Sequence, residues 1–168
     1  METEWNEVLW RQLGAAIEML GNAIEACPES LWSDRSRNPE FWYLAYHTTF
    51  FLDYYLSDSE TGFAPPAPFT LAELDPAGVM PERPFTKAEL LRYLTFAKEK
   101  GRALIAALNG ERAASRCGFE RFDISVSELL LYSMRHVQHH AAQLNLILRQ
   151  ATDAPPGWVR RTNVPVRG

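Results

Sequence analysis

The sequence predicts an all-α fold, a four-helix bundle with one long proline-rich crossover between its second and third helices. Three observations favour this class. Apolar residues recur at helical spacing over four long segments, no segment alternates polar and apolar residues with a period of two, and no glycine-rich phosphate loop occurs. The chain has 168 residues, a suitable length for one domain, so we expect a single domain over residues 1–168.

The first helix is expected over residues 4–26. Apolar side chains recur there at steps of three and four, which places them on one face of an amphipathic helix. Cys27-Pro28 then ends the helix, because proline lacks the amide hydrogen that a helix interior needs. In the short connector that follows, Leu31 and Trp32 are expected to pack beneath the end of the bundle.

The second helix is expected to run from Phe41 to Leu56, with Asn38 as its N-terminal cap and Pro39 in its first turn. Nearly every residue of this segment is apolar or aromatic. A helix that is apolar on all sides is buried on all sides, so a partner subunit or a covering loop has to supply the remaining contacts. The sequence leaves both open, and we expect a homodimer.

Residues 58–85 connect the second and third helices. Six prolines exclude a regular helix from this stretch: Pro65, Pro66, Pro68, Pro76, Pro81 and Pro84. A connection of this length in a small domain either has a function or crosses between distant corners of a bundle. We favour a crossover that also covers part of the aromatic second helix.

Two capping boxes mark the starts of the last two helices. In each, a hydroxyl residue is followed three positions later by glutamate: Thr86 by Glu89, and Ser125 by Glu128. The hydroxyl and the carboxylate then satisfy backbone amides that have no partner within the first turn of a helix.

The third helix is expected to end near Asn109-Gly110 and the fourth near Gln150. Asparagine followed by glycine is typical of a helix end. The tail, residues 151–168, is mildly basic and is expected to lie on the surface as a strap.

Charge and composition exclude several classes of protein. The chain has 17 Lys+Arg against 21 Asp+Glu, a formal charge of −4, whereas nucleic-acid binders carry a concentrated positive field. No apolar run approaches the ~18–20 residues that span a bilayer, and the acidic start does not resemble a signal peptide. The two cysteines, Cys27 and Cys117, are too few for a disulfide framework, so we expect inert thiols and a cytoplasmic location.

The four histidines are unevenly distributed: His47 lies on the second helix, and His136, His139 and His140 lie on the fourth. At ~100° per residue, His140 falls within the apolar face of its helix and His136 at the edge of that face. His139 points ~135° away from the centre of the face. We therefore expect His136 and His140 to point inward together and His139 to point outward.

Two imidazoles at positions i and i+4 have Cβ atoms about 6 Å apart, so both rings can reach one metal ion. His47 lies between Leu44 and Phe51, which belong to the core stripe of its own helix. If the second and fourth helices are neighbours, His47, His136 and His140 converge inside the bundle. The alternative is that each is a buried side chain with its own hydrogen-bond partner.

The sequence resembles the DinB/YfiT-like family of small bacterial four-helix-bundle proteins over roughly residues 5–150. The resemblance is carried by WYLAYH, which ends at His47, and by HVQHHAAQL from His136 to Leu144. The family pattern pairs one histidine on the second helix with H-x3-H on the last helix, followed by H-x-x-Q. Four residues occupy these positions: His47, His136, His140 and Gln143. The family often has glycine before this glutamine, where this chain has Ala142.

The resemblance implies that His47, His136 and His140 bind a divalent metal, zinc or nickel, with open coordination positions. Such an ion lowers the pKa of a bound water or thiol. Related proteins are thiol-dependent transferases or isomerases, so we expect S-transfer from a low-molecular-weight thiol to an electrophile in detoxification or stress response. Gln143 is then a contact to a metal ligand or to the substrate.

A second hypothesis is a non-enzymatic dimeric bundle with a vestigial or sensory metal site. A di-iron centre is excluded, because it requires Glu-x-x-His pairs and the residues three positions before the inward histidines are Leu44, Ser133 and Val137. Helical periodicity places no Asp or Glu beside the histidines. The sequence therefore predicts no general acid or base.

Overall fold

The computed structural model describes residues 2–57 and 59–167, and its secondary structure is helical. The elements are these: α1 (Glu2–Ala26), α2 (Glu29–Trp32), α3 (Phe41–Tyr55), the 3-10 turn η1 (Leu71–Leu74), α4 (Lys87–Ala106), α5 (Gly110–Ala114) and α6 (Val126–Thr152). No strand forms among these residues, which contain only two isolated β-bridges. The all-α prediction is confirmed. Within the described residues, no helix combines the length and apolar character needed to cross a membrane.

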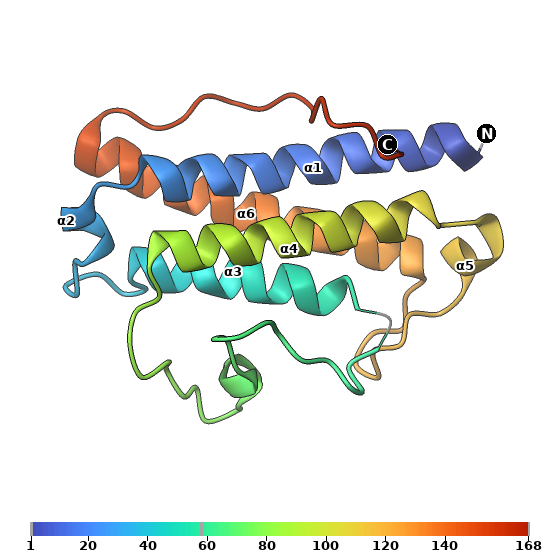
Figure 1. Ribbon diagram of the computed structural model, residues 1–168, viewed down its shortest axis with the longest axis horizontal. Coiled ribbons are helices and arrows are strands. Elements are labelled where there is room, and N and C mark those ends of the chain that lie inside the picture. Colours follow the sequence, from blue (N-terminus) through green and yellow to red (C-terminus); the bar gives the residue numbers. More distant parts are fainter. Residues whose placement is uncertain (1, 58, 168) are drawn as a thin grey trace.

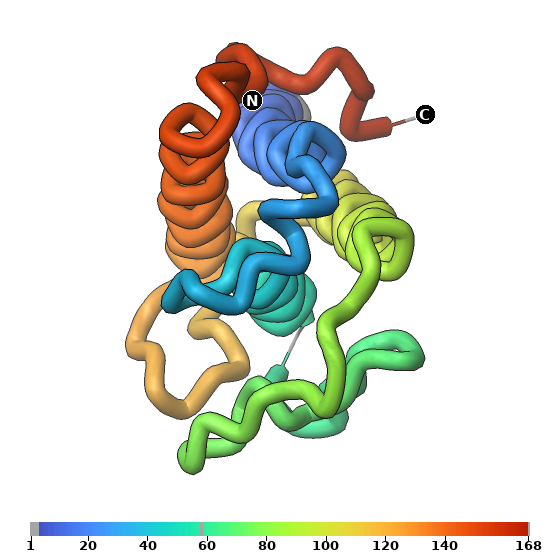
Figure 2. Tube along the Cα trace, turned by 90° about the vertical axis from the view of Figure 1, so that its left-hand side faces the viewer, coloured from blue at the N-terminus to red at the C-terminus, as the bar shows by residue number. Residues whose placement is uncertain are grey.

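The four long helices, α1, α3, α4 and α6, lie alongside one another (Figure 1). Seen close to end-on, each occupies one corner of the core, and α3 lies between α6 and α4 (Figure 2). α1 makes its contacts mainly with α6 and α4, and α3 also packs mainly on these two helices. This order makes α3 and α6 neighbours, which is the arrangement that the three inward histidines require.

The predicted capping boxes form at both expected helix starts. Thr86 accepts a hydrogen bond from the Glu89 amide while the Glu89 side chain returns to the Thr86 backbone, and Ser125 and Glu128 do the same. Leu31 and Trp32 are buried, as expected, on the short helix α2. These local signals depend on a few adjacent residues, which explains why they are readable without the tertiary structure.

The helix expected from Phe41 does begin there, but its predicted cap, Asn38, and the predicted place of Pro39 in its first turn are wrong. The helix begins at Phe41 with Glu40 in the capping position, and Asn38 and Pro39 precede it. The Glu40 carboxylate accepts a hydrogen bond of 2.6 Å from the Trp42 indole and forms no side-chain cap with the backbone. The third helix also ends earlier than expected, at Ala106, because Asn109 caps the separate short helix α5.

The connection between α3 and α4, called the crossover below, covers the outer face of α3. Phe63 and Phe69 are buried, and their rings pack against aromatic rings of α3: the centroid of Phe63 lies 5.0 Å from that of Tyr54, and the centroid of Phe69 lies 5.9 Å from that of Tyr46. Of the two expected explanations for the apolar second helix, the structure contains the covering loop. The homodimer stays a prediction.

The segment after α6 returns along α1 as a C-terminal strap, residues 153–167 (Figure 1). The Trp10 indole donates a 2.8 Å hydrogen bond to the Val164 carbonyl, and Thr162 is buried against Gly14. A Cβ atom at Gly14 would lie 2.5 Å from the Thr162 methyl group, so a glycine is needed there for the strap to approach.

Candidate metal centre

The seam between α3 and α6 brings together the three histidines that the sequence analysis singled out. The ring centroids of His47 lie 5.4 Å from His136 and 5.1 Å from His140, and those of His136 and His140 lie 4.5 Å apart. Each ring offers one nitrogen, and these three atoms all lie within 4.8 Å of one another. His136 and His140 meet because one helical turn separates them, and α3 supplies His47 from across the seam.

A carboxylate from the crossover holds the His47 ring. His47 Nδ1 lies 2.6 Å from Glu73 Oε1, which also accepts a 3.1 Å hydrogen bond from the Tyr43 hydroxyl. Because an ionised carboxylate only accepts hydrogen bonds, the proton is on His47 Nδ1. In the neutral imidazole this leaves Nε2 with the lone pair that a metal needs, and the Glu73 side chain, only 4% exposed, is shielded from competing water.

Gln143 has the same relation to His140. The distance from His140 Nδ1 to Gln143 Oε1 is 2.7 Å, so the amide oxygen accepts the Nδ1 hydrogen. Gln143 itself is exposed at the outer edge of the cluster. Two of the three imidazoles are thus oriented by an oxygen acceptor at Nδ1, which is the usual arrangement around histidines that bind metals through Nε2.

His136 is the most buried of the three rings, and its Nδ1 atom is buried without a hydrogen-bond partner. Burial, and to a lesser extent the neighbouring His140, His47 and His139, lower the pKa of His136 to about 3. Burial also lowers the pKa of His140. Both rings are therefore neutral at pH 7, the form of histidine that binds metals.

The three histidines fit a divalent ion. Nitrogen ligands at 2.0–2.1 Å from a tetrahedral zinc are about 3.4 Å apart, so small side-chain rotations bring the nitrogens into range. On one side, Phe51 and Tyr55 pack on His136, with ring centroids at 5.8 and 5.9 Å. The His47 side chain remains 27% exposed, so the cluster is reachable from solvent. Three neutral nitrogen ligands and an accessible face are typical of catalytic rather than structural zinc sites.

The other residues considered in the sequence analysis lie outside this cluster. His139 is exposed, as expected from its position on the helix, although its ring lies 4.9 Å from that of His140. Cys27 and Cys117 are buried and unbonded to each other, and burial raises the pKa of Cys27 to about 12. A thiol with so high a pKa is a poor nucleophile at neutral pH.

Glu73 is the site residue that the sequence analysis missed. It comes from the 3-10 turn η1, inside the proline-rich crossover, where no helical period indicates which side chains point inward. The one available signal is local: Leu71, Ala72 and Leu74 flank Glu73 in a segment otherwise rich in proline and acidic residues. That signal indicates a short packed turn, but it does not indicate that Glu73 contacts His47.

Comparison with known proteins assigns the chain to a family. The model of the DinB superfamily matches residues 12–144, which include α3, α4, most of α1 and α6, and the three clustered histidines. No curated protein and no solved structure matches the chain. Since the match covers most of the sequence, the chain belongs to the DinB superfamily.

Proposed function

We propose that this protein is a metal-dependent thiol S-transferase, with zinc or nickel bound by His47, His136 and His140. One observation supports this most strongly: three imidazole nitrogens lie within 4.8 Å of one another at a half-buried, solvent-accessible position. Family membership supports the same proposal. The expected setting is detoxification or stress response in the cytoplasm.

The reaction is a substitution at an electrophilic carbon. The sulfur–carbon bond forms, the bond from carbon to the leaving group breaks, and the thiol proton leaves with that group. A divalent ion held by His47, His136 and His140 would supply Lewis acidity that lowers the pKa of a thiol and makes the thiolate available at neutral pH.

The residues of the chain position the reactants. Glu73 and Gln143 hold His47 and His140 with Nε2 directed away from their own hydrogen bonds. The rings of Phe51 and Tyr55 exclude water from one side of His136, which favours thiol over water as the nucleophile. Gln143, being exposed, is also placed to contact a bound thiol.

The test is S-alkylation of a panel of glutathione-, bacillithiol- and mycothiol-type thiols by a model electrophile, 1-chloro-2,4-dinitrobenzene. The zinc- or nickel-loaded protein is expected to accelerate product formation with at least one thiol. His140→Ala is expected to abolish the acceleration, and Arg149→Gln, an exposed residue farther along α6, is expected to preserve it.

Two results contradict the proposal. A protein that binds metal stoichiometrically without turnover on any thiol supports the non-enzymatic alternative, a vestigial or sensory site. An equal rate for wild type and His140→Ala shows that the histidine cluster does not catalyse the reaction.

A further inference from the structure

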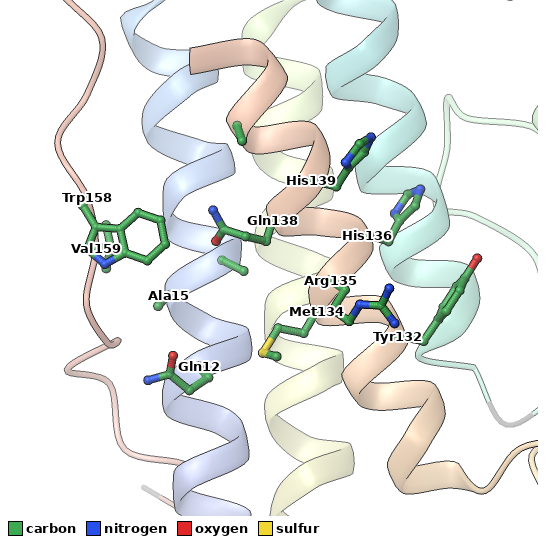
Figure 3. Close-up of a pocket in the computed structure, with 12 residues that line it drawn as sticks. Gln12, Ala15, Tyr132, Met134, Arg135, His136, Gln138, His139, Trp158 and Val159 are labelled. Carbon is green, nitrogen blue, oxygen red and sulfur yellow. The ribbon is translucent and has the colours of Figure 1, made fainter. Parts of the chain in front are cut away.

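A hollow of about 660 Å³ lies over α6, between the C-terminal strap and the histidine cluster. Figure 3 shows Trp158 and Val159 of the strap on one side of α6, with His136 on the other side. Its volume is within the range of small-molecule sites, roughly 300–1,000 Å³. Because His136 belongs to both the lining and the cluster, this hollow borders the candidate metal centre.

The hollow carries an unbalanced positive charge. None of its lining residues is acidic, although the chain has 21 Asp+Glu and a net charge of −4. Arg135 lines the hollow, and its guanidinium forms no hydrogen bond or ion pair with any residue in 2–57 or 59–167. By comparison, the exposed Arg11 pairs with Glu7 at 2.9 Å. In Figure 3 the Arg135 guanidinium lies on the same side of α6 as Tyr132.

The other part of the lining is apolar and built from small residues. Ala15 and Ala142 leave room beside α6, and Met134 and Val159 border the same space. Trp158, within the strap, is 69% exposed, an unusual position for a residue this large and apolar. A ligand that covers this indole would gain hydrophobic contact that the free protein lacks.

We propose that the hollow binds a small monocarboxylate with an apolar body. Its carboxylate pairs with the Arg135 guanidinium, and its apolar part lies over the alanines toward Trp158. The inference deepens the proposed function and rests on it, because it identifies the electrophilic substrate of the same site as an amphipathic anion. Arginine is suited to this task, since its planar group donates two parallel hydrogen bonds to one carboxylate.

Isothermal titration calorimetry of the metal-free protein at pH 7.5 tests this site with octanoate and its neutral counterpart octanamide. Omitting the metal prevents the carboxylate from binding to an ion. Wild type is expected to bind octanoate about fivefold more tightly than octanamide, the upper range for an exposed ion pair. Arg135→Gln is expected to bind the two probes equally, whereas Arg149→Gln, on the same helix but outside the hollow, retains the preference.

Equal binding of both probes to wild type overturns the proposal, as does a preference that survives in Arg135→Gln or disappears in Arg149→Gln. Neither arginine has a partner that its substitution would leave unpaired, so both variants are expected to fold. The result is independent of catalysis. A preference for octanoate without thiol transfer would support this carboxylate site and refute the S-transferase. Thiol transfer without the preference would support the S-transferase and refute the carboxylate site.

Discussion

Helix α3 carries two polar clusters, one at His47 and one at Asp53, about 9 Å apart along the helix axis. At Asp53, which is fully buried, both carboxylate oxygens accept hydrogen bonds: Oδ1 from Lys100 at 2.6 Å and Oδ2 from Tyr93 at 3.0 Å. The Lys100 ammonium completes its bonds with the Asp53 carbonyl and Ser57. Every donor and acceptor of this cluster is matched within the protein.

The cluster at His47 is incomplete by the same criterion. Glu73 Oε2 and His136 Nδ1 are buried without hydrogen-bond partners. Buried polar atoms without partners cost free energy and are uncommon in native proteins. The difference indicates that the Asp53 cluster stabilises the bundle by itself, whereas the histidine cluster is arranged for a ligand.

The largest expected effect is a difference in the free energy of unfolding between variants of the two clusters. Asp53→Ala leaves the Lys100 ammonium and the Tyr93 hydroxyl without their acceptor, and we expect the free energy of unfolding to fall by about 3 kcal/mol. In metal-free protein, His140→Ala removes no bond on which a buried charge depends and costs much less. Urea denaturation of both variants measures this. If His140→Ala were as destabilising as Asp53→Ala, the distinction between the clusters would be wrong.

The next effect concerns metal affinity. Glu73→Gln keeps an acceptor for His47 Nδ1 but removes its negative charge, and changes of this kind lower metal affinity about 10–100-fold. Competition with a chromophoric zinc chelator gives the dissociation constants. Tyr43→Phe is the matched control, because it removes the other hydrogen bond to the same oxygen and leaves the His47 contact in place. Wild-type affinity in Glu73→Gln would refute the role of the crossover in the site.

The smallest effect is a pH dependence of stability in the metal-free protein. The pKa of His136 is lowered to about 3 in the folded state, while an unfolded histidine has a pKa near 6.5. Between these values the unfolded chain binds more protons, so stability is fully present above about pH 6.5 and declines toward pH 3. His136→Gln is expected to flatten this decline in urea titrations at pH 7, 6 and 5. An unchanged slope would contradict the burial argument.

Much of the helical structure was predictable because its signals are local and periodic. Steps of three and four assigned the long helices, and the same periodicity separated the inward His136 and His140 from the exposed His139. The capping boxes were equally readable. Asp53 offered a signal that was not used: it is the only acid in the aromatic segment Phe41–Tyr55 and therefore required a buried partner.

The missed features depend on contacts between segments far apart in the sequence. Glu73 reaches His47 only because the crossover folds back over α3, and no period or motif encodes that path. The cap of α3 was misassigned to Asn38: Glu40 occupies that position, and its carboxylate bonds to the Trp42 indole instead of the backbone, a choice that depends on how Trp42 packs. Side-chain geometry of this kind arises from tertiary packing, so local sequence patterns do not predict it.

The metal content of the untagged protein is the decisive measurement. After equilibrium dialysis against zinc and removal of free metal, elemental analysis is expected to find one ion per chain in wild type. His139→Ala, which alters the exposed histidine beside the cluster, is expected to retain that ion, and His140→Ala is expected to lose it. A wild-type protein without bound metal, or equal losses in the two variants, would show that the three imidazoles do not share a cation.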